Sequence, residues 1–300
     1  MNDIILHIGI PKTATTHFQD NVFQKTGCIK YLGRPYISDS LTNVVRSIVM
    51  EDTMVFNAKK IQKIWNTVAS DSKSRPVMFS EEAFTNGWII TDFGMVVRRM
   101  REVLHASKII ITIREQSSFL TSWYAAGNLR LHNSNFRSYC NLDDWVLQQL
   151  ESDIPAGIFR TLDYWTIVNA LEETFGKSNI LVTVFEEFIL SPMIYNSKIS
   201  DFIGCKLFCA SSEDHVNASI YSRKYHKYEK FRNVLPIKRG SIARFLPGLA
   251  KLFGRGLLAR GGKIKMTEPV EKILRARFKE QNRRINSEYR LKLEEYGYTI

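Results

Sequence analysis

The chain has 300 residues, of which 44% are hydrophobic, and its formal net charge is +12 at pH 7. This is enough apolar material to bury one full α/β core, and no change of composition or linker indicates a second domain, so we expect a single domain over residues 1–300. No apolar run reaches the roughly eighteen residues of a membrane span, which argues against a membrane-spanning helix.

The N-terminus and the cysteines predict a cytoplasmic protein. Asp3 stands where a signal peptide would carry basic charge. The cysteines are too few and too scattered for a disulfide framework or a zinc site, so we expect reduced thiols. They are Cys28, Cys140, Cys205 and Cys209.

The first expected element is a buried strand, Ile-Ile-Leu-His-Ile-Gly-Ile over residues 4–10, and a helix is expected over residues 15–23. The tight loop between them leaves backbone N–H groups at the helix start without helical partners, and the helix dipole favours an anion there. Lys12 adds a positive charge. Hydroxyl donors come from Thr13, Thr15 and Thr16. The loop therefore predicts anion binding.

The loop sequence narrows the kind of anion. A nucleotide-binding P-loop carries two glycines around its lysine, whereas this loop has only Gly9. The segment Pro11-Lys12-Thr13-Ala14-Thr15-Thr16 instead resembles the 5′-phosphosulfate-binding loop of sulfotransferases that use 3′-phosphoadenosine-5′-phosphosulfate (PAPS), especially the carbohydrate and bacterial branch. That branch commonly has Lys-Thr-Gly-Thr-Thr. Alanine at position 14 predicts an ordinary negative φ there.

Residues 76–84 predict a short strand that ends in two carboxylates, in the sequence Pro-Val-Met-Phe-Ser-Glu-Glu-Ala-Phe. Ligands of parallel sheets lie beyond the carboxyl ends of strands, where Glu81 and Glu82 fall. The segment resembles a Ser-x-Glu element of bacterial and glycan sulfotransferases, and alignment on Ser80 implies that Glu82 is the general base. A Walker B strand end of a Mg-ATP enzyme, and a carboxylate that caps a helix or faces solvent, stay open as alternatives.

A further strand is expected over residues 108–113, with Arg114 at its end and Ser122 eight residues later in the next helix. A guanidinium and a hydroxyl suit a small oxyanion. The spacing resembles the 3′-phosphate-binding motif of sulfotransferases, which implies that Arg114 and Ser122 hold the 3′-phosphate of PAPS. Glu115-Gln116 follows the arginine, where the family often has Asn-Pro. A surface ion pair for Arg114 and a solvated Ser122 are the alternatives.

The later elements indicate architecture. We expect a helix over residues 164–175 closed by Gly176, a strand over residues 179–188, and a helix that ends at Gly204. This succession is similar to the fourth-strand region of sulfotransferases. Asn217 and Ser219 are expected in a turn or a cap.

The whole net charge lies in residues 221–265. This basic segment holds thirteen Lys and Arg and one acid, and the rest of the chain holds 29 basic and 29 acidic residues. Three interpretations compete: contact with an anionic membrane surface, a wall or lid for an anionic glycan, and a solvated face. No nucleic-acid-binding module is recognisable, so no nucleic-acid partner is expected.

Together these patterns predict an α/β protein with a mostly parallel central sheet flanked by helices, the P-loop-like sulfotransferase fold. The resemblance implies transfer of a sulfuryl group from PAPS to a hydroxyl of a carbohydrate or glycolipid, with Lys12 at the leaving phosphate, Glu82 as base and no metal. The alternatives are a Mg-ATP-dependent kinase and a non-catalytic glycan- or membrane-binding protein. Acceptor loops are expected over residues 30–60, 125–160 and 221–265. Peripheral contact with the inner membrane face and the oligomeric state stay open.

Overall fold

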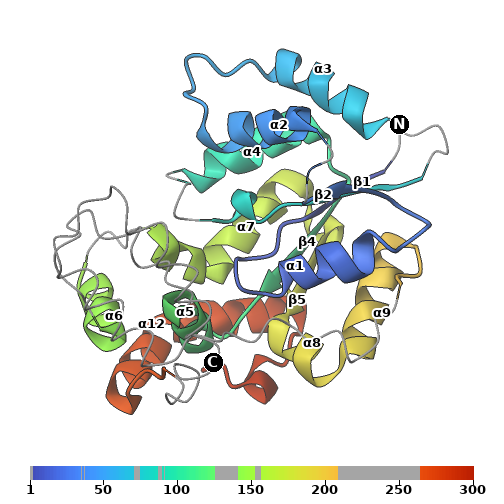
Figure 1. Ribbon diagram of the computed structural model, residues 1–300. Coiled ribbons are helices and arrows are strands. Elements are labelled where there is room, and N and C mark those ends of the chain that lie inside the picture. Colours follow the sequence, from blue (N-terminus) through green and yellow to red (C-terminus); the bar gives the residue numbers. More distant parts are fainter. Residues whose placement is uncertain are drawn as a thin grey trace, which may run out of the picture. The chain divides into compact units, whose positions relative to one another are not determined.

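The computed structural model (Figure 1) shows an α/β protein. It describes residues 3–34, 36, 38–70, 75–86, 90, 92–125, 141–152, 157–208 and 264–300. These residues form two compact units. The first takes in the described parts of Met1–Glu115, Ile154–Asn217 and Arg275–Ile300, and the second those of Gln116–Asp153 and Ala218–Leu274.

The first unit is built on a five-stranded sheet in which all strand pairs are parallel and the order is β2-β3-β1-β4-β5. The strands are β1 (Ile4–His7), β2 (Lys30–Gly33), β3 (Val77–Ser80), β4 (Lys108–Ile113) and β5 (Ile180–Val184). Most strand residues are buried, as is usual in parallel sheets covered on both faces. This confirms the predicted α/β fold with its parallel central sheet.

Helices cover both faces of this sheet (Figure 1). On one face Ile5, Met78 and Ile110 pack against η1, α8 and α9. On the other face, where Trp65 contacts Phe79, lie α2, α3, α4 and α7. The bounds are α1 Thr15–His17, η1 Phe18–Phe23, α2 Asp39–Met50, α3 Ala58–Ala69, η2 Glu82–Phe84, α4 Phe93–Leu104, η4 Gly157–Leu162, α7 Tyr164–Phe175, η5 Lys177–Asn179, α8 Phe185–Leu190, α9 Pro192–Ile203 and η8 Leu293–Tyr296.

The sequence positions several of these helices through their capping residues. Asn57, Asp92 and Asp163 each accept a backbone N–H bond at the start of α3, α4 and α7. Gly176 and Gly204 follow α7 and α9 with φ of 85° and 72°, which glycine adopts readily. Both helix ends lie where the sequence predicts them.

The second unit contains α5 (Gln116–Ala125), α6 (Leu142–Leu150) and the first residues of α12 (Glu268–Tyr289). Ser117 Oγ donates to Glu271 Oε1 at 2.9 Å, and Thr267 N–H donates to Asp143 Oδ1 at 3.1 Å. These two bonds join the beginning of α12 to α5 and α6.

Two local predictions are wrong. The strand expected over residues 179–188 ends at Val184, because two acidic residues in the first turn favour a helix start at Phe185. The segment 30–60, expected as a loop, instead contains β2, α2 and the start of α3, while its role in acceptor binding stays a prediction. Its apolar residues recur at helical spacing and are buried, as Leu41 and Val45 show.

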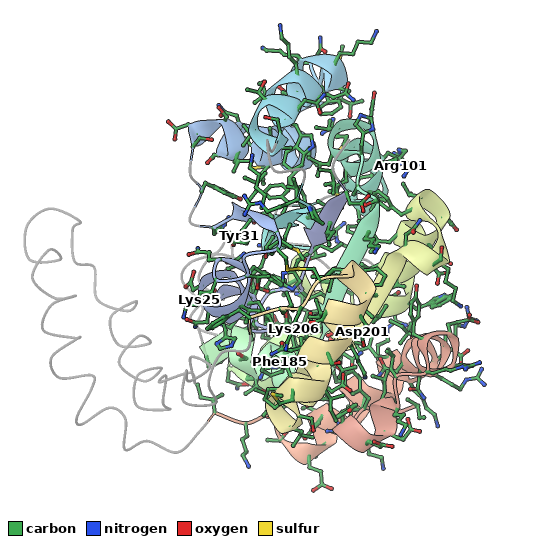
Figure 2. The ribbon with its side chains drawn as sticks, turned by 90° about the vertical axis from the view of Figure 1, so that its right-hand side faces the viewer. Lys25, Tyr31, Arg101, Phe185, Asp201 and Lys206 are labelled. Atoms are coloured by element: carbon green, nitrogen blue, oxygen red, sulfur yellow. A yellow bond between two sulfur atoms is a disulfide. The ribbon has the colours of Figure 1, made fainter. Side chains whose placement is uncertain are left out.

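A disulfide joins Cys28 to Cys205, with the two Cα atoms 6.3 Å apart (Figure 2). The expectation of reduced thiols is therefore wrong for this pair. The fold brings the turn after η1 beside the end of α9, and a sequence separation of 177 residues gives no sign of this.

Several predictions fall outside the described residues. These are the basic segment up to residue 263, the turn with Asn217 and Ser219, and the cysteines Cys140 and Cys209. In the described part of the chain, no helix combines the length and apolar character needed to span a bilayer.

Candidate functional site

The candidate site lies at the carboxyl edge of the sheet, where several strands end side by side. His7 of β1 is in register with Ser80 of β3, and Ser80 is in register with Gly33 of β2. The segments that leave these strands therefore start from one level. In open α/β sheets this edge is the usual place for a ligand.

The loop after β1 contains two residues in the left-handed conformation, Lys12 with φ 70° and Ala14 with φ 62°. The prediction of a negative φ at Ala14 is wrong: the alanine keeps a conformation that favours glycine, at a cost of about 1–2 kcal/mol. Left-handed residues in such a loop turn successive N–H groups toward one concave side that suits an anion. Helix α1 then begins at Thr15, as predicted, and η1 continues it to Phe23.

Close packing around Gly9 fixes the loop. A Cβ at Gly9 would lie 2.7 Å from Thr15 Oγ1 and 3.1 Å from Thr13 Oγ1, so only glycine fits. Thr13 Oγ1 donates to the Ile10 carbonyl at 2.5 Å, and Thr85 Oγ1 donates to the Gly9 carbonyl at 3.1 Å. The hydroxyl hydrogen of Thr13 is thus used to hold the loop.

The remaining loop residues differ in exposure. Pro11 and Thr15 are buried, Lys12 is half-buried and Thr16 is exposed. Burial lowers the pKa of the Lys12 ammonium; the nearby Glu82 carboxylate raises it and Arg114 lowers it further. The loop therefore presents a desolvated cation beside an acid.

The two carboxylates after β3 have different roles. Glu81 is fully buried and caps η2: its carboxylate accepts from Ala83 N–H at 2.8 Å and from Arg34 Nε at 3.2 Å. Glu82 instead lies near the loop, where Thr15 and the Lys12 ammonium lower its pKa. Glu81 thus takes the capping role, and the prediction of Glu82 as the base stays open.

Burial raises the pKa of Glu82; the hydrogen bond from Thr15 lowers it, Glu81 raises it, and Arg34 and Lys12 lower it. The raised pKa makes the Glu82 carboxylate a better proton acceptor than an ordinary glutamate.

Three buried polar residues at this edge contact one another, and the sequence did not indicate this cluster. His7 Nδ1 is 2.8 Å from Ser80 Oγ, and Gln19 Nε2 donates to Ser80 Oγ at 3.1 Å and to the Ser80 carbonyl at 3.2 Å. Burial lowers the pKa of His7 to about 3, so its ring is neutral. Only the strand-end register of His7 with Ser80 would have indicated this contact.

Arg114 lies beside the loop, as predicted. Its Nη1 donates to the Lys12 carbonyl at 2.7 Å, and its guanidinium carbon lies 4.4 Å from the centre of the Phe185 ring. Tyr164 donates its hydroxyl to the Arg114 carbonyl. These contacts come from three separate segments of the first unit and hold the arginine at the site.

Glu186 supports Arg114, although the sequence indicated only architecture for its segment. The Glu186 carboxylate accepts from Glu115 N–H at 3.0 Å and from the Tyr298 hydroxyl at 3.3 Å. Its charge is close enough to Arg114 to act on the pKa of the guanidinium.

Ser122 lies on α5 of the second unit, and its pairing with Arg114 stays a prediction. Among the described residues, no group of three or more His, Cys, Asp or Glu side chains is placed to hold a metal ion.

The chain is similar in fold to sulfotransferases of known structure. One is a sulfotransferase from Alicyclobacillus acidocaldarius, with a TM-score of 0.55 and 13% identity over 99% of both chains. Another is a mouse sulfotransferase complexed with PAP, with a TM-score of 0.46 and 16% identity over 98% of this chain and 88% of that one.

No protein-family model and no curated protein sequence matches this chain. At such low identity the likeness to the Alicyclobacillus protein defines the fold, and that fold is the one of a sulfotransferase.

Proposed function

We propose that this protein is a sulfotransferase that moves a sulfuryl group from PAPS to a hydroxyl of a carbohydrate or glycolipid. One observation carries the proposal: the Lys12 loop, Glu82 and Arg114 meet at the carboxyl edge of the sheet, with Arg114 Nη1 2.7 Å from the Lys12 carbonyl. The fold shared with a known sulfotransferase supports it. A cytoplasmic location stays a proposal without support from reduced thiols, because Cys28 and Cys205 form a disulfide.

The described residues fit this cofactor. The loop of residues 11–16 offers N–H groups on a concave backbone and one ammonium, which suit the 5′-phosphosulfate. Arg114 offers a guanidinium fork beside the loop for the 3′-phosphate, with Ser122 as its proposed partner. When bound, the cofactor supplies the sulfuryl group and a phosphate that leaves with negative charge.

Lys12 and Glu82 would do the chemistry that belongs to the protein. The Lys12 ammonium neutralises the charge that develops on the leaving oxygen, and this is strongest in a site shielded from water. The Glu82 carboxylate takes the proton of the acceptor hydroxyl as that oxygen attacks. Thr15, on the loop beside Glu82, lowers the pKa of this carboxylate.

This assignment predicts the pH dependence of kcat/KM. Glu82 must be ionised, and burial raises its pKa, so activity should be lost on the acid side at a pH above the pKa of an ordinary carboxyl group. Lys12 must be protonated, and burial lowers its pKa, so activity on the basic side should be lost at a pH below the pKa of an ordinary lysine. Glu82→Gln should abolish the acid limb together with roughly 10²- to 10⁴-fold of turnover, while nucleotide affinity stays unchanged.

A matched control for this variant is Glu102→Gln, an exposed glutamate on α4. It should leave both rate and pH profile unchanged. If Glu82→Gln kept full turnover, the base would be another group. If the unaltered protein bound the nucleotide but showed no turnover, it would be a non-catalytic binder.

Calorimetry tests the cofactor. 3′-Phosphoadenosine 5′-phosphate should bind without metal, and Arg114→Ala should weaken binding by about tenfold or more. The control is Arg101→Ala: its guanidinium also lies over a phenylalanine ring, at 5.8 Å from Phe175, and Figure 2 shows Arg101 well away from Phe185. A preference for ATP with Mg²⁺ would instead identify a kinase.

A further inference from the structure

Arg34 lies on the side of the site that the cofactor contacts leave open. The strand order places Arg34 after β2, Glu82 after β3, the Lys12 loop after β1 and Arg114 after β4. Neighbouring strands are about 4.8 Å apart. The two proposed phosphate contacts lie at β1 and β4, so the acceptor must reach Glu82 from the β3 and β2 side.

The Arg34 side chain is held in place there. Its Nε donates to Glu81 Oε2 at 3.2 Å, and Glu81 is itself fully buried and fixed by Ala83 N–H. The guanidinium carbon lies 5.6 Å from the centre of the Tyr36 ring. An arginine so anchored loses less conformational freedom when it binds a ligand than an exposed one that moves freely.

The backbone of Arg34 is fixed as well. Its carbonyl accepts from the Tyr31 hydroxyl at 2.9 Å and from Gln24 Nε2 at 3.4 Å. The Tyr31 hydroxyl can reach this carbonyl because Gly33 has no Cβ, which would collide with it.

The two Nη nitrogens of the Arg34 guanidinium are placed to bind a ligand. Within the described residues, the only hydrogen bond that the Arg34 side chain donates is the one from Nε, and 60% of the side chain is exposed. Arg34 bonds to Glu81, the residue that directly precedes the proposed base, and its charge lowers the pKa of Glu82. A planar pair of Nη donors matches the two oxygens of a carboxylate, sulfate or phosphate.

We propose that Arg34 binds an oxyanion carried by the acceptor, next to the hydroxyl that Glu82 deprotonates. The inference rests on the proposed function and narrows its acceptor to an anionic one. The net charge of +12, concentrated in residues 221–265, favours the approach of such a molecule.

The test measures sugar binding by calorimetry with the full chain saturated with 3′-phosphoadenosine 5′-phosphate. The probes are three sugars: glucose, which carries no anionic group, glucuronate, which carries a carboxylate, and glucose 6-phosphate, which carries a phosphate. At least one charged sugar should bind about ten- to a hundredfold more tightly than glucose, and Arg34→Gln should remove this preference. Arg34→Lys, with charge but without the fork, should keep part of it.

Two further variants separate recognition from structure. Arg34→Gln leaves the buried Glu81 charge without its partner, so the double variant Arg34→Gln/Glu81→Gln removes both charges and restores folding. It too should lack the preference. Arg98→Gln is the matched control. Arg98 lies on α4, 71% of its side chain is exposed, and it forms an ion pair with Asp92 at 3.9 Å. This variant should keep the preference for the charged sugar.

Equal binding of all three sugars by the unaltered protein, or a preference that survives in the double variant, would overturn the role of Arg34. Nucleotide binding is measured first and separately. If the nucleotide fails to bind, the proposed function is wrong, and the same sugar comparison without nucleotide still decides whether Arg34 recognises an oxyanion.

Discussion

At the scale of single residues, Lys12 and Ala14 hold left-handed backbone conformations without the help of glycine. Such conformations persist where the surroundings fix them, and they concentrate at functional sites. Here the surroundings are two threonine hydroxyls bonded to backbone carbonyls, Thr13 to Ile10 and Thr85 to Gly9. The shape of the loop therefore depends on these bonds and on the space at Gly9.

Gly9→Ala should damage the loop more than the fold. The new methyl would overlap the Thr15 hydroxyl, so we expect at least about a tenfold loss of nucleotide affinity by calorimetry and a destabilisation of about 1–3 kcal/mol. Gly27→Ala is the matched control, because nothing lies within 4 Å of its added Cβ. Equal effects of the two variants on nucleotide affinity would show that the packing at Gly9 does not shape the site.

The sequence predicted where the candidate residues lie better than their conformations. Lys12 and Arg114 follow apolar strands in a recognisable pattern, and the structure brings them together. The φ of Ala14 could not be predicted, because the preference of alanine is overridden by contacts from residues far along the chain. Likewise, Glu81 and Glu82 differ only through their neighbours, Arg34 for one and the Lys12 loop for the other.

At the scale of elements, hydroxyl groups attach α9 to the sheet. The Tyr195 hydroxyl lies 2.8 Å from Thr112 Oγ1 on β4 and 2.9 Å from Thr183 Oγ1 on β5, and these two are 2.9 Å apart. All three residues are buried, and burial raises the pKa of Tyr195 to about 12. Helix α9, which ends two residues before Cys205, is thereby fixed to two strands.

Tyr195→Phe should destabilise the protein by about 1–2 kcal/mol, since it leaves buried hydroxyls with fewer partners. Chemical denaturation measures this change. Tyr289→Phe provides the comparison: its hydroxyl bonds to Glu172 in a partly buried place, where water can replace it, and the cost should be smaller. A smaller cost for Tyr195→Phe would mean that the hydroxyl group adds nothing to the attachment of α9.

The sequence predicted strongly apolar strands more successfully than strands with polar residues. Strands β1, β3 and β4 are nearly uninterrupted apolar runs. Strand β2 is only Lys-Tyr-Leu-Gly, with two half-buried residues at the edge of the sheet, and it carries no such pattern. Its position matters all the same, because it places Arg34.

At the scale of the whole molecule, the order of the strands decides which segments meet. Residues 7, 80 and 33 are far apart in sequence but end at one level. A single sequence does not contain this order in readable form. The disulfide between Cys28 and Cys205 is a second long-range link of this kind.

Reduction of the disulfide should lower the free energy of unfolding by about 2–4 kcal/mol, because the link closes a loop of 177 residues and restricts the unfolded chain. The melting temperature with and without dithiothreitol measures the effect. Cys28→Ser/Cys205→Ser should melt like the reduced protein and not respond to the reagent. An unaltered melting temperature after complete reduction would show that the link does not stabilise the fold.

The contact between His7, Ser80 and Gln19 also sets the charge beside the proposed base. The Ser80 hydroxyl accepts from Gln19 Nε2 and lies 2.8 Å from His7 Nδ1. With its pKa lowered to about 3, the imidazole stays uncharged while Glu82 and Lys12 titrate. The strand end that carries the proposed base thus keeps a neutral neighbour on β1, whether the base holds its proton or not.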